Sequence, residues 1–164
     1  MASGDTLVVL TPLHNEPPAS GFATLDWRNL HPVLDFEAGL DNVAVFTGIM
    51  PRNYAGGDIR VHLHFAMSAA TSGDVVWMVA FERIGNQVQD IDSDGFATAT
   101  SGTISVPSTS GNVKNGQIDV FSSNLDGIQA GETFRIKVTR DADNAADTAG
   151  GDAELVAIEL QEKP

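Results

Sequence analysis

Nine consecutive residues, 59–67, alternate between two kinds of side chain, and this alternation restricts the chain to folds built from β-sheets. The apolar members are Ile59, Val61, Leu63, Phe65 and Met67, and they are separated by Arg60, His62, His64 and Ala66. Successive side chains of a strand point to opposite faces of its sheet. Residues 59–67 therefore predict a strand with one dry face and one wet face.

A second segment, residues 75–84, predicts a strand that is buried on both faces. One face carries Val75, Trp77, Val79 and Phe81, and the other carries Val76, Met78, Ala80 and Ile84. Antiparallel sheets commonly leave one face to solvent, so we expect a loop, the N-terminal segment or another subunit to cover the second face. Val76 and Met78 are therefore expected to contact a partner surface.

The chain from residue 32 onward consists of short apolar runs divided by turns. Further strands are predicted at 33–36, 43–47, 96–106, 117–122, 133–140 and 153–161. The 16 glycines and 7 prolines are spread throughout, and no long segment has helical periodicity. Most turns are long, which favours jelly-roll connections over a simple meander. The sequence thus predicts an all-β, antiparallel, jelly-roll-like sandwich of about eight to ten strands over residues 32–164.

Residues 1–31 differ from the rest of the chain and are predicted to form an extended N-terminal arm. Pro12, Pro17 and Pro18 remove backbone donors and stiffen this segment. A disordered leader is the alternative, although the apolar residues of the arm need cover. Together with the two residues of the doubly apolar strand, the predicted partner-binding residues are Leu7, Val8, Val9, Leu10, Leu13, Phe22, Trp27, Val76 and Met78.

The charge balance is strongly acidic, with 9 lysines and arginines against 22 aspartates and glutamates and a formal net charge of -13. Such a surface repels phosphate backbones and anionic lipids, so we expect neither nucleic acid nor membrane as a partner. The first residues lack the basic start of a signal peptide, and no apolar run approaches the roughly 20 residues that span a bilayer. We expect a soluble protein.

Asp90, Asp92 and Asp94, followed by Gly95, form the most suggestive motif for a ligand. Carboxylates at alternate positions before a glycine are typical of calcium loops. The twelfth position of this loop is Ser101 instead of a bidentate glutamate, so a solvated acidic turn is the alternative. A second acidic loop, residues 141–152, could share a cation with the first if the two lie close together.

Other site chemistries have weaker support in the sequence. His62 and His64 point the same way on their strand, but a zinc site needs a third ligand, and a polar sheet face is the alternative. Trp27, Tyr54 and Trp77 could stack on sugar rings. The chain contains no cysteine and no motif of a serine hydrolase, zinc protease or P-loop enzyme. We therefore expect a protein that is not an enzyme and has no cofactor, apart from the calcium ion that Asp90, Asp92 and Asp94 could bind.

Several segments resemble short β-sandwich proteins encoded among the structural genes of tailed phages and prophages. The resemblance lies in residues 23–29, 31–36, 45–57, 72–83, 134–143 and 151–155 and would cover nearly the whole chain from about residue 7. It implies a virion component with no catalytic residues.

The resemblance does not decide which component, but the proline-stiffened arm, the doubly apolar strand at residues 75–84 and the acidic exterior favour a capsid decoration protein. Such a protein would be made in the host cytoplasm, form a homo-oligomer, with a trimer favoured, and bind the major capsid protein on the outer capsid surface. The arm would clamp capsid subunits, since an extended segment can add to the edge of a neighbouring sheet. The alternative is a receptor- or glycan-binding module of a head or tail fibre.

Overall fold

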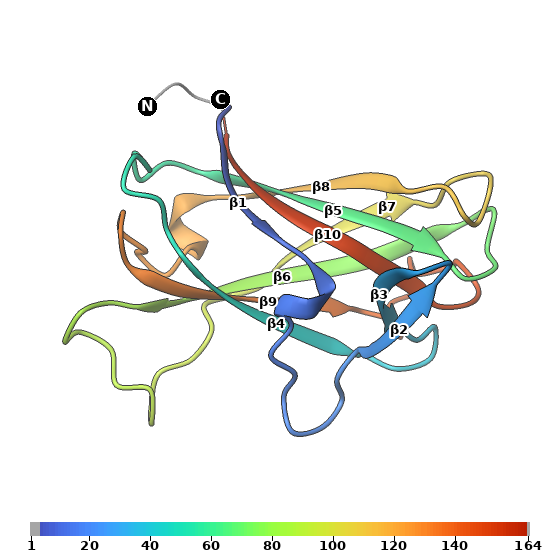
Figure 1. Ribbon diagram of the computed structural model, residues 1–164, viewed down its shortest axis with the longest axis horizontal. Coiled ribbons are helices and arrows are strands. Elements are labelled where there is room, and N and C mark those ends of the chain that lie inside the picture. The colour runs from blue at the N-terminus through green and yellow to red at the C-terminus, as the bar shows by residue number, and fades with distance from the viewer. Residues whose placement is uncertain (1–3, 164) are drawn as a thin grey trace.

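The structure, a computed structural model, describes residues 4–163 and consists of two antiparallel β-sheets stacked face to face (Figure 1). The ten strands are β1 (Thr6–Leu10), β2 (Thr24–Arg28), β3 (His31–Phe36), β4 (Val43–Ile49), β5 (Ile59–Met67), β6 (Asp74–Ile84), β7 (Thr100–Ser105), β8 (Lys114–Val120), β9 (Thr133–Arg140) and β10 (Ala153–Glu162). The six-stranded sheet has the order β2-β3-β10-β5-β8, with β1 also paired to β10, and the four-stranded sheet has the order β4-β9-β6-β7. The predicted all-β, jelly-roll-like sandwich is confirmed.

Residues 59–67 form β5, a strand with one apolar face as predicted, and it lies between β10 and the edge strand β8 in the six-stranded sheet. Its apolar side chains face the other sheet and are fully buried. Phe65 and Phe36 meet the ring of Trp77 edge-on, with ring centroids 5.4 Å and 4.9 Å away. Such edge-to-face contacts add to the stabilisation that burial of aromatic surface provides. The polar side chains of β5 lie on the outer face of the sheet.

The second face of β6 is covered by loops of the same chain. Val76 is only 2% exposed, and its backbone N–H donates to Asp147 Oδ2 at 3.0 Å. Phe96, in the loop before β7, lies 5.1 Å from the Arg135 guanidinium carbon and 4.9 Å from Lys137 Nζ on the neighbouring strand β9. The expectation that Val76 contacts a partner protein is therefore wrong. Met78 is half-buried.

The N-terminal segment is part of the sandwich, which differs from the predicted free arm. β1 pairs with β10, and Leu10 opposite Ile158 is buried in the core. β2 pairs with β3 across the predicted domain boundary at residues 31 and 32. Leu7 and Val8 pack against the same core. Because β1 and β2 make their ladder hydrogen bonds to strands of the same chain, residues 4–31 belong to the sandwich domain.

The connection between β1 and β2 covers one edge of the four-stranded sheet. Glu16 N–H donates to Val45 O at 2.7 Å, and Ala23 N–H donates to Val43 O at 2.9 Å. A three-residue 3-10 turn, Pro12–His14, precedes these contacts.

In residues 4–163 no helix has the length and apolar character needed to cross a membrane.

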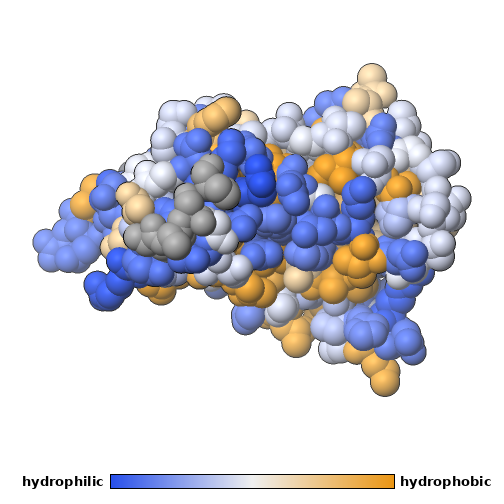
Figure 2. All heavy atoms as spheres, turned by 90° about the horizontal axis from the view of Figure 1, so that it is seen from above, coloured by the Kyte–Doolittle hydropathy of each residue, from blue (hydrophilic) through white to orange (hydrophobic). Residues whose placement is uncertain are grey.

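The surface of the molecule is mainly polar, with apolar side chains exposed in places. Seen from above the view of Figure 1, hydrophilic residues cover most of the surface and hydrophobic residues form small separate groups (Figure 2). Within residues 4–163, the exposed large apolar side chains include Leu13, Phe22, Leu25, Trp27 and Leu30, all from the segment that leads into and through β2. Other exposed large apolar side chains, such as Ile49, Ile91 and Phe121, lie singly on other strands and loops.

Candidate ligand-binding site

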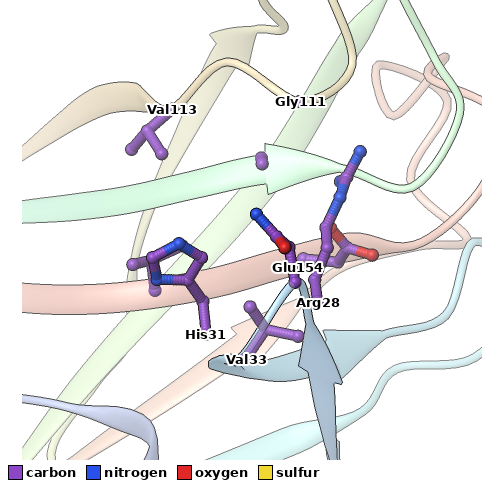
Figure 3. Close-up of a pocket in the computed structure, with 9 residues that line it drawn as sticks. Arg28, His31, Val33, Gly111, Val113 and Glu154 are labelled. Carbon is purple, nitrogen blue, oxygen red and sulfur yellow. The ribbon is translucent and has the colours of Figure 1, made fainter.

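A cavity of about 390 Å³ lies on the outer face of the six-stranded sheet, at the end where β2, β3 and β10 meet. Its lining comes from four strands and the loop before β8, as Figure 3 shows. The lining residues are Arg28, Asn29, His31, Val33, Ala66, Gly111, Val113, Glu154 and Val156. The volume is near the lower end of the roughly 300–1,000 Å³ range of small-molecule sites.

Valine and alanine side chains form the apolar floor of the cavity. Val33 and Ala66 are buried, and Val156 is half-buried beside them. Val113 projects from the loop on the far side and is more exposed. An apolar floor with a few polar groups at its rim is the usual composition of a ligand site.

The tight turn between β2 and β3 fixes one wall of the cavity. Arg28 and His31 are opposite one another across residues 29 and 30. Asn29 and Leu30 have positive φ angles of 47° and 67°, the conformation of a two-residue hairpin turn that matches the twist of its strands. Positive φ is unfavourable for leucine, so the surrounding sheet imposes this conformation and thereby holds Arg28, Asn29 and His31 together.

Arg28 and Glu154 form an ion pair at the rim. Arg28 Nη1 donates to Glu154 Oε2 and also to the backbone oxygen of Met67, the latter at 2.8 Å. The side chain of Glu154 is nearly buried, whereas about a third of the Arg28 side chain is exposed. The arginine therefore retains donors for a ligand, while its orientation is fixed by the partners that it already has.

Asp35 lies beside this pair on the outer face, opposite Glu154 in the sheet register. Burial raises the pKa of Asp35 to about 6, with further increases from Glu154, Asp26 and Asp152 and an opposing effect of Arg28. Asp35 Oδ1 is buried and has no hydrogen-bond partner within residues 4–163. Four carboxylates thus share one guanidinium, which makes the surroundings of the cavity acidic.

The two histidines of β5 belong to a polar sheet face and do not form a zinc site. His62 is buried between Asn115 Oδ1, 3.0 Å from Nδ1, and Gln161 Oε1, 2.9 Å from Nε2. Both ring nitrogens are therefore engaged by amide side chains. His64 lies 4.0 Å from Glu159 and has no second acidic or histidine neighbour that would complete a group of three among the described residues.

The predicted calcium ligands Asp90, Asp92 and Asp94 lie in an exposed turn. Asp90 Oδ1 accepts the backbone N–H of Asp92 at 3.0 Å, as in an ordinary Asx turn. The three carboxylates do not form a compact ligand group in the part of the chain that the structure describes. Calcium binding at this loop therefore gains no support, and the solvated acidic turn describes the geometry.

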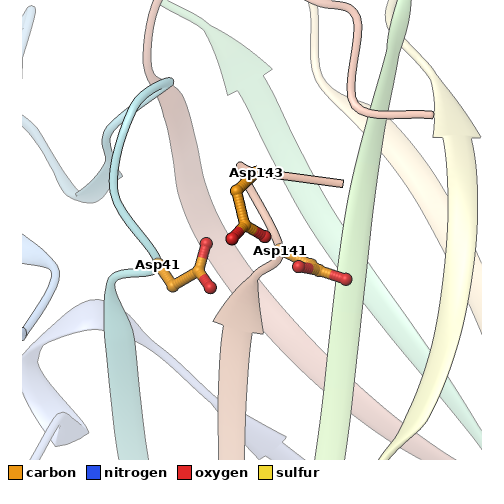
Figure 4. A group of neighbouring side chains, drawn as sticks. All are labelled: Asp41, Asp141 and Asp143. Atoms are coloured by element: carbon orange, nitrogen blue, oxygen red, sulfur yellow. The ribbon is translucent and has the colours of Figure 1, made fainter. Parts of the chain in front are cut away.

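The second acidic loop, residues 141–152, lies beside Asp41 and not beside the Asp90 loop with which it could have shared a cation. Asp141 and Asp143, just after β9, face Asp41 in the turn before β4 (Figure 4). Their ligand atoms lie within 4.8 Å of one another. The charge of Asp41 and a hydrogen bond with Asp141 raise the pKa of Asp143. Mutual repulsion among these carboxylates disfavours the charged form of Asp143 and opposes their close approach, which the hydrogen bond from Ala142 N–H to Asp41 Oδ1 at 2.8 Å helps to maintain.

The remaining predicted partner-binding residues are partly buried in the sandwich and partly exposed at its surface. Leu10 is buried in the core and Leu7 and Val8 are partly buried against it, so these three are not free for a partner. Val9, Leu13, Phe22 and Trp27 are exposed. Of the aromatic residues considered for sugar stacking, Tyr54 and Trp77 are buried, which leaves Trp27 alone at the surface.

Comparisons with known proteins show the fold. No family model matches the sequence, and no curated protein matches it. The isomalto-dextranase of Arthrobacter globiformis T6, solved with panose, is similar over 86% of this chain and 21% of its own, with a TM-score of 0.53 and 16% identity. An arabinose-bound α-L-arabinofuranosidase is similar over 90% of this chain and 23% of its own, with a TM-score of 0.50 and 11% identity. The chain shares the fold of a β-sandwich module.

A third solved structure has the size of this chain. A family 11 carbohydrate-binding module from Clostridium thermocellum, in complex with a mixed-linked tetrasaccharide, is similar over 99% of this chain and 98% of its own, with a TM-score of 0.49 and 11% identity. The chain spans only about a fifth of the two larger enzymes described above.

Proposed function

We propose that the protein is a carbohydrate-binding module that holds a glycan in the cavity lined by Arg28, His31 and Glu154. The observation that carries this proposal is the combination of an apolar floor with an oriented Arg28–Glu154 pair at the rim. A sugar ring has apolar C–H surfaces and hydroxyl groups that both donate and accept hydrogen bonds. The cavity offers a counterpart to each of these features.

The negative charge around the cavity favours neutral glycans over anionic ones as ligands. Glu154, Asp35 and Asp26 outnumber Arg28 on this part of the sheet. An anionic sugar would be repelled by these carboxylates, so neutral glycans fit better. The sugar ligands named with two structures of similar fold, panose and arabinose, are neutral as well.

Binding without hydrolysis suits the residues present. Glycoside hydrolysis ordinarily requires two carboxyl groups that flank the scissile bond. Glu154 is the one carboxylate among the described residues that line the cavity, and its Oε2 accepts a hydrogen bond from Arg28.

The test is a glycan array followed by titration calorimetry with the best ligand. Arg28→Gln and His31→Ala should each weaken binding by about tenfold, the change that loss of one or two hydrogen bonds produces. His14→Ala changes an exposed histidine outside the cavity and should bind normally. Absence of any glycan ligand, or equal binding by all three variants, would show that the cavity is not the site.

A second proposed function is decoration of a tailed-phage capsid, one of the virion roles compatible with the sequence resemblance. The observation that favours it is a shallow apolar hollow of about 260 Å³ beside the exposed Leu13 and Phe22. Because β1 belongs to the sandwich, removal of the whole segment 1–22 would disrupt the fold, and point variants give a cleaner test. The double variant Leu13→Ser/Phe22→Ser should abolish binding to purified capsids while glycan binding persists. Undiminished capsid binding by this double variant would contradict the decoration role.

A further inference from the structure

The strand β2 ends the six-stranded sheet and pairs only with β3 among the described strands. A free sheet edge exposes unpaired backbone groups that can pair with another strand. At the edge of the other sheet, β4 is partly covered by the segment around Glu16 and Ala23. Within residues 4–163 no segment covers β2 in this way, and neither lysine nor proline occurs within the strand to discourage pairing.

The hairpin geometry decides which backbone groups of β2 are free. Arg28 and His31 flank a two-residue turn, and residues in that position exchange both hydrogen bonds with each other. Because hydrogen bonding alternates along an antiparallel strand, the N–H and C=O groups of Leu25 and Trp27 point away from β3. These groups form a regular row that a second strand could use.

The side chains of β2 give this edge two different faces. Leu25 and Trp27 are 45% and 57% exposed, and they lie on one face. Asp26 and Arg28 lie on the other face, opposite Val33 and His31 of β3. An edge with a large exposed aromatic residue on one face and two opposite charges on the other is well suited to a strand of matching pattern.

A second copy of β2 has that matching pattern. In antiparallel pairing with Trp27 opposite Trp27 of the second copy, Asp26 lies opposite Arg28 of the second copy, and two-fold symmetry repeats this pair. Two other registers place like charges together. One puts Asp26 opposite Asp26 of the second copy, and the other puts Arg28 opposite Arg28 of the second copy. Among the registers centred on residues 26, 27 and 28, charge complementarity therefore selects the one centred on Trp27.

We propose that the protein forms a two-fold symmetric homodimer through antiparallel pairing of β2 with β2 of a second copy, with the Trp27 residues opposite each other. The pairing joins two six-stranded sheets into one continuous sheet and covers the exposed Leu25 and Trp27 side chains. A two-fold contact of this kind uses the same surface of both copies and closes at two subunits. The trimer implied by the phage resemblance would require a different contact.

The dimer has a consequence for the ligand site, and this step rests on the proposed function. Arg28 and Asn29 line the cavity and also lie at the proposed interface. The two cavities would therefore open on the same face of the joined sheet, on either side of the two-fold axis. A polymeric glycan could bind both at once, which raises its overall affinity without any new contact.

Disulfide trapping tests the register directly, because the chain contains no cysteine. Residues directly opposite in a hydrogen-bonded antiparallel pair have Cα atoms about 5.5 Å apart, within the range that a disulfide bridges. Trp27→Cys should give a covalent dimer under mild oxidation. Leu25→Cys is the matched control and should not, because Leu25 lies opposite Asn29 of the second copy.

Sedimentation analysis of the full chain over a wide concentration range provides the second measurement. Asp26→Arg, which places two arginines opposite each other, should raise the dimer dissociation constant by about tenfold or more. Asp92→Arg makes the same charge change in an exposed loop and should leave the constant unchanged. A wild-type protein that stays monomeric, a dimer that Asp26→Arg leaves intact, or covalent trapping through Leu25→Cys would each overturn the proposal.

Failure of the dimer and failure of the glycan site give different results. A monomer that binds a glycan with the expected loss in His31→Ala would refute only the dimer. A dimer trapped through Trp27→Cys that binds no glycan would refute only the proposed function.

Discussion

At the scale of single residues, Arg140 has the largest structural role of any charged side chain in the described chain. It is fully buried, and its guanidinium donates to both carboxylate oxygens of Asp147 at 3.0 and 2.7 Å. It also donates to the backbone oxygens of Phe36, Ala149 and Gly151. One side chain thereby ties the loop after β9 to the end of β3.

Replacement of Arg140 should be severely destabilising. Arg140→Met leaves Asp147 as a buried, unpaired charge and removes the donors of three carbonyl groups, so we expect the free energy of unfolding to fall by about 3–5 kcal/mol. Urea denaturation would measure this change. Arg52→Met alters an exposed arginine and should change stability by less than about 0.5 kcal/mol. Similar small effects of both variants would contradict the assigned role.

Asp35 should make stability depend on pH in the acidic range. Its pKa is raised in the folded protein to about 6 from an ordinary value of 3.8, so between these values the folded state holds more protons than the unfolded state. Stability therefore falls as pH rises through this window and stays lowered above it. Asp35→Asn should raise Tm at pH 7 and lose this advantage near pH 4. A Tm difference that is the same at both pH values would argue against this titration.

At the scale of elements, the two sheets are brought close together at β7 and β8 by reciprocal pairs of glycine and isoleucine. A Cβ atom on Gly116 would lie 2.4 Å from Ile104 Cδ1, and one on Gly102 would lie 2.9 Å from Ile118 Cγ1. Each strand thus contributes one large side chain that fills the space above a glycine of the other strand. This interlocking fixes the position of β7 over β8.

Gly116→Val should therefore separate the sheets locally. Added volume in a packed interior costs about 1–3 kcal/mol, and we expect a loss of this size in chemical denaturation. The second change Ile104→Ala makes room and should restore part of the loss. Gly39→Ala introduces a Cβ atom with no neighbour within 4 Å and should have little effect. Additive losses in the double variant would refute the interlocking.

The elements could largely be predicted from the sequence, because most of them carry their own local signal. The alternation of residues 59–67 and the apolar run 75–84 correspond to β5 and β6. The sequence places β1 and β2 in an arm because Pro12, Pro17 and Pro18 between them mark this part of the chain as extended and stiff. Their place in the sheet depends on pairing with β10 and β3, which no local pattern encodes.

The ligand site could not be predicted in the same way. Arg28 and Glu154 are 126 residues apart in the chain, and only the sheet order brings them together. The alternation of β10 indicates that Glu154 points outward, but nothing in the sequence says which strand lies beside it. The acidic motif at Asp90 has a strong local pattern, but its three carboxylates are not arranged as a compact calcium-binding group in the described part of the chain.

At the scale of the whole molecule, the net charge of -13 should weaken the folded state at low ionic strength. Repulsion among many acidic groups acts over long distances and is screened by salt. Tm should therefore rise with sodium chloride concentration in thermal melts, and Asp143→Asn should reduce the gain, because Asp143 lies close to Asp41 and Asp141. A fall in Tm with added salt would show that attractive ion pairs dominate instead.

The two ends of the domain meet at one place, since Gly4 N–H donates to Glu162 O at 2.9 Å and Glu162 N–H donates to Asp5 O at 3.0 Å. β1 and β10 then run side by side from this point (Figure 1). Tension applied through both ends would act across the hydrogen bonds of this pair one after another, as in opening a zipper. β1 would peel away under a small force while the remaining strands stayed folded. The β1–β10 pair is thus the part of the domain that a pull along the backbone opens first.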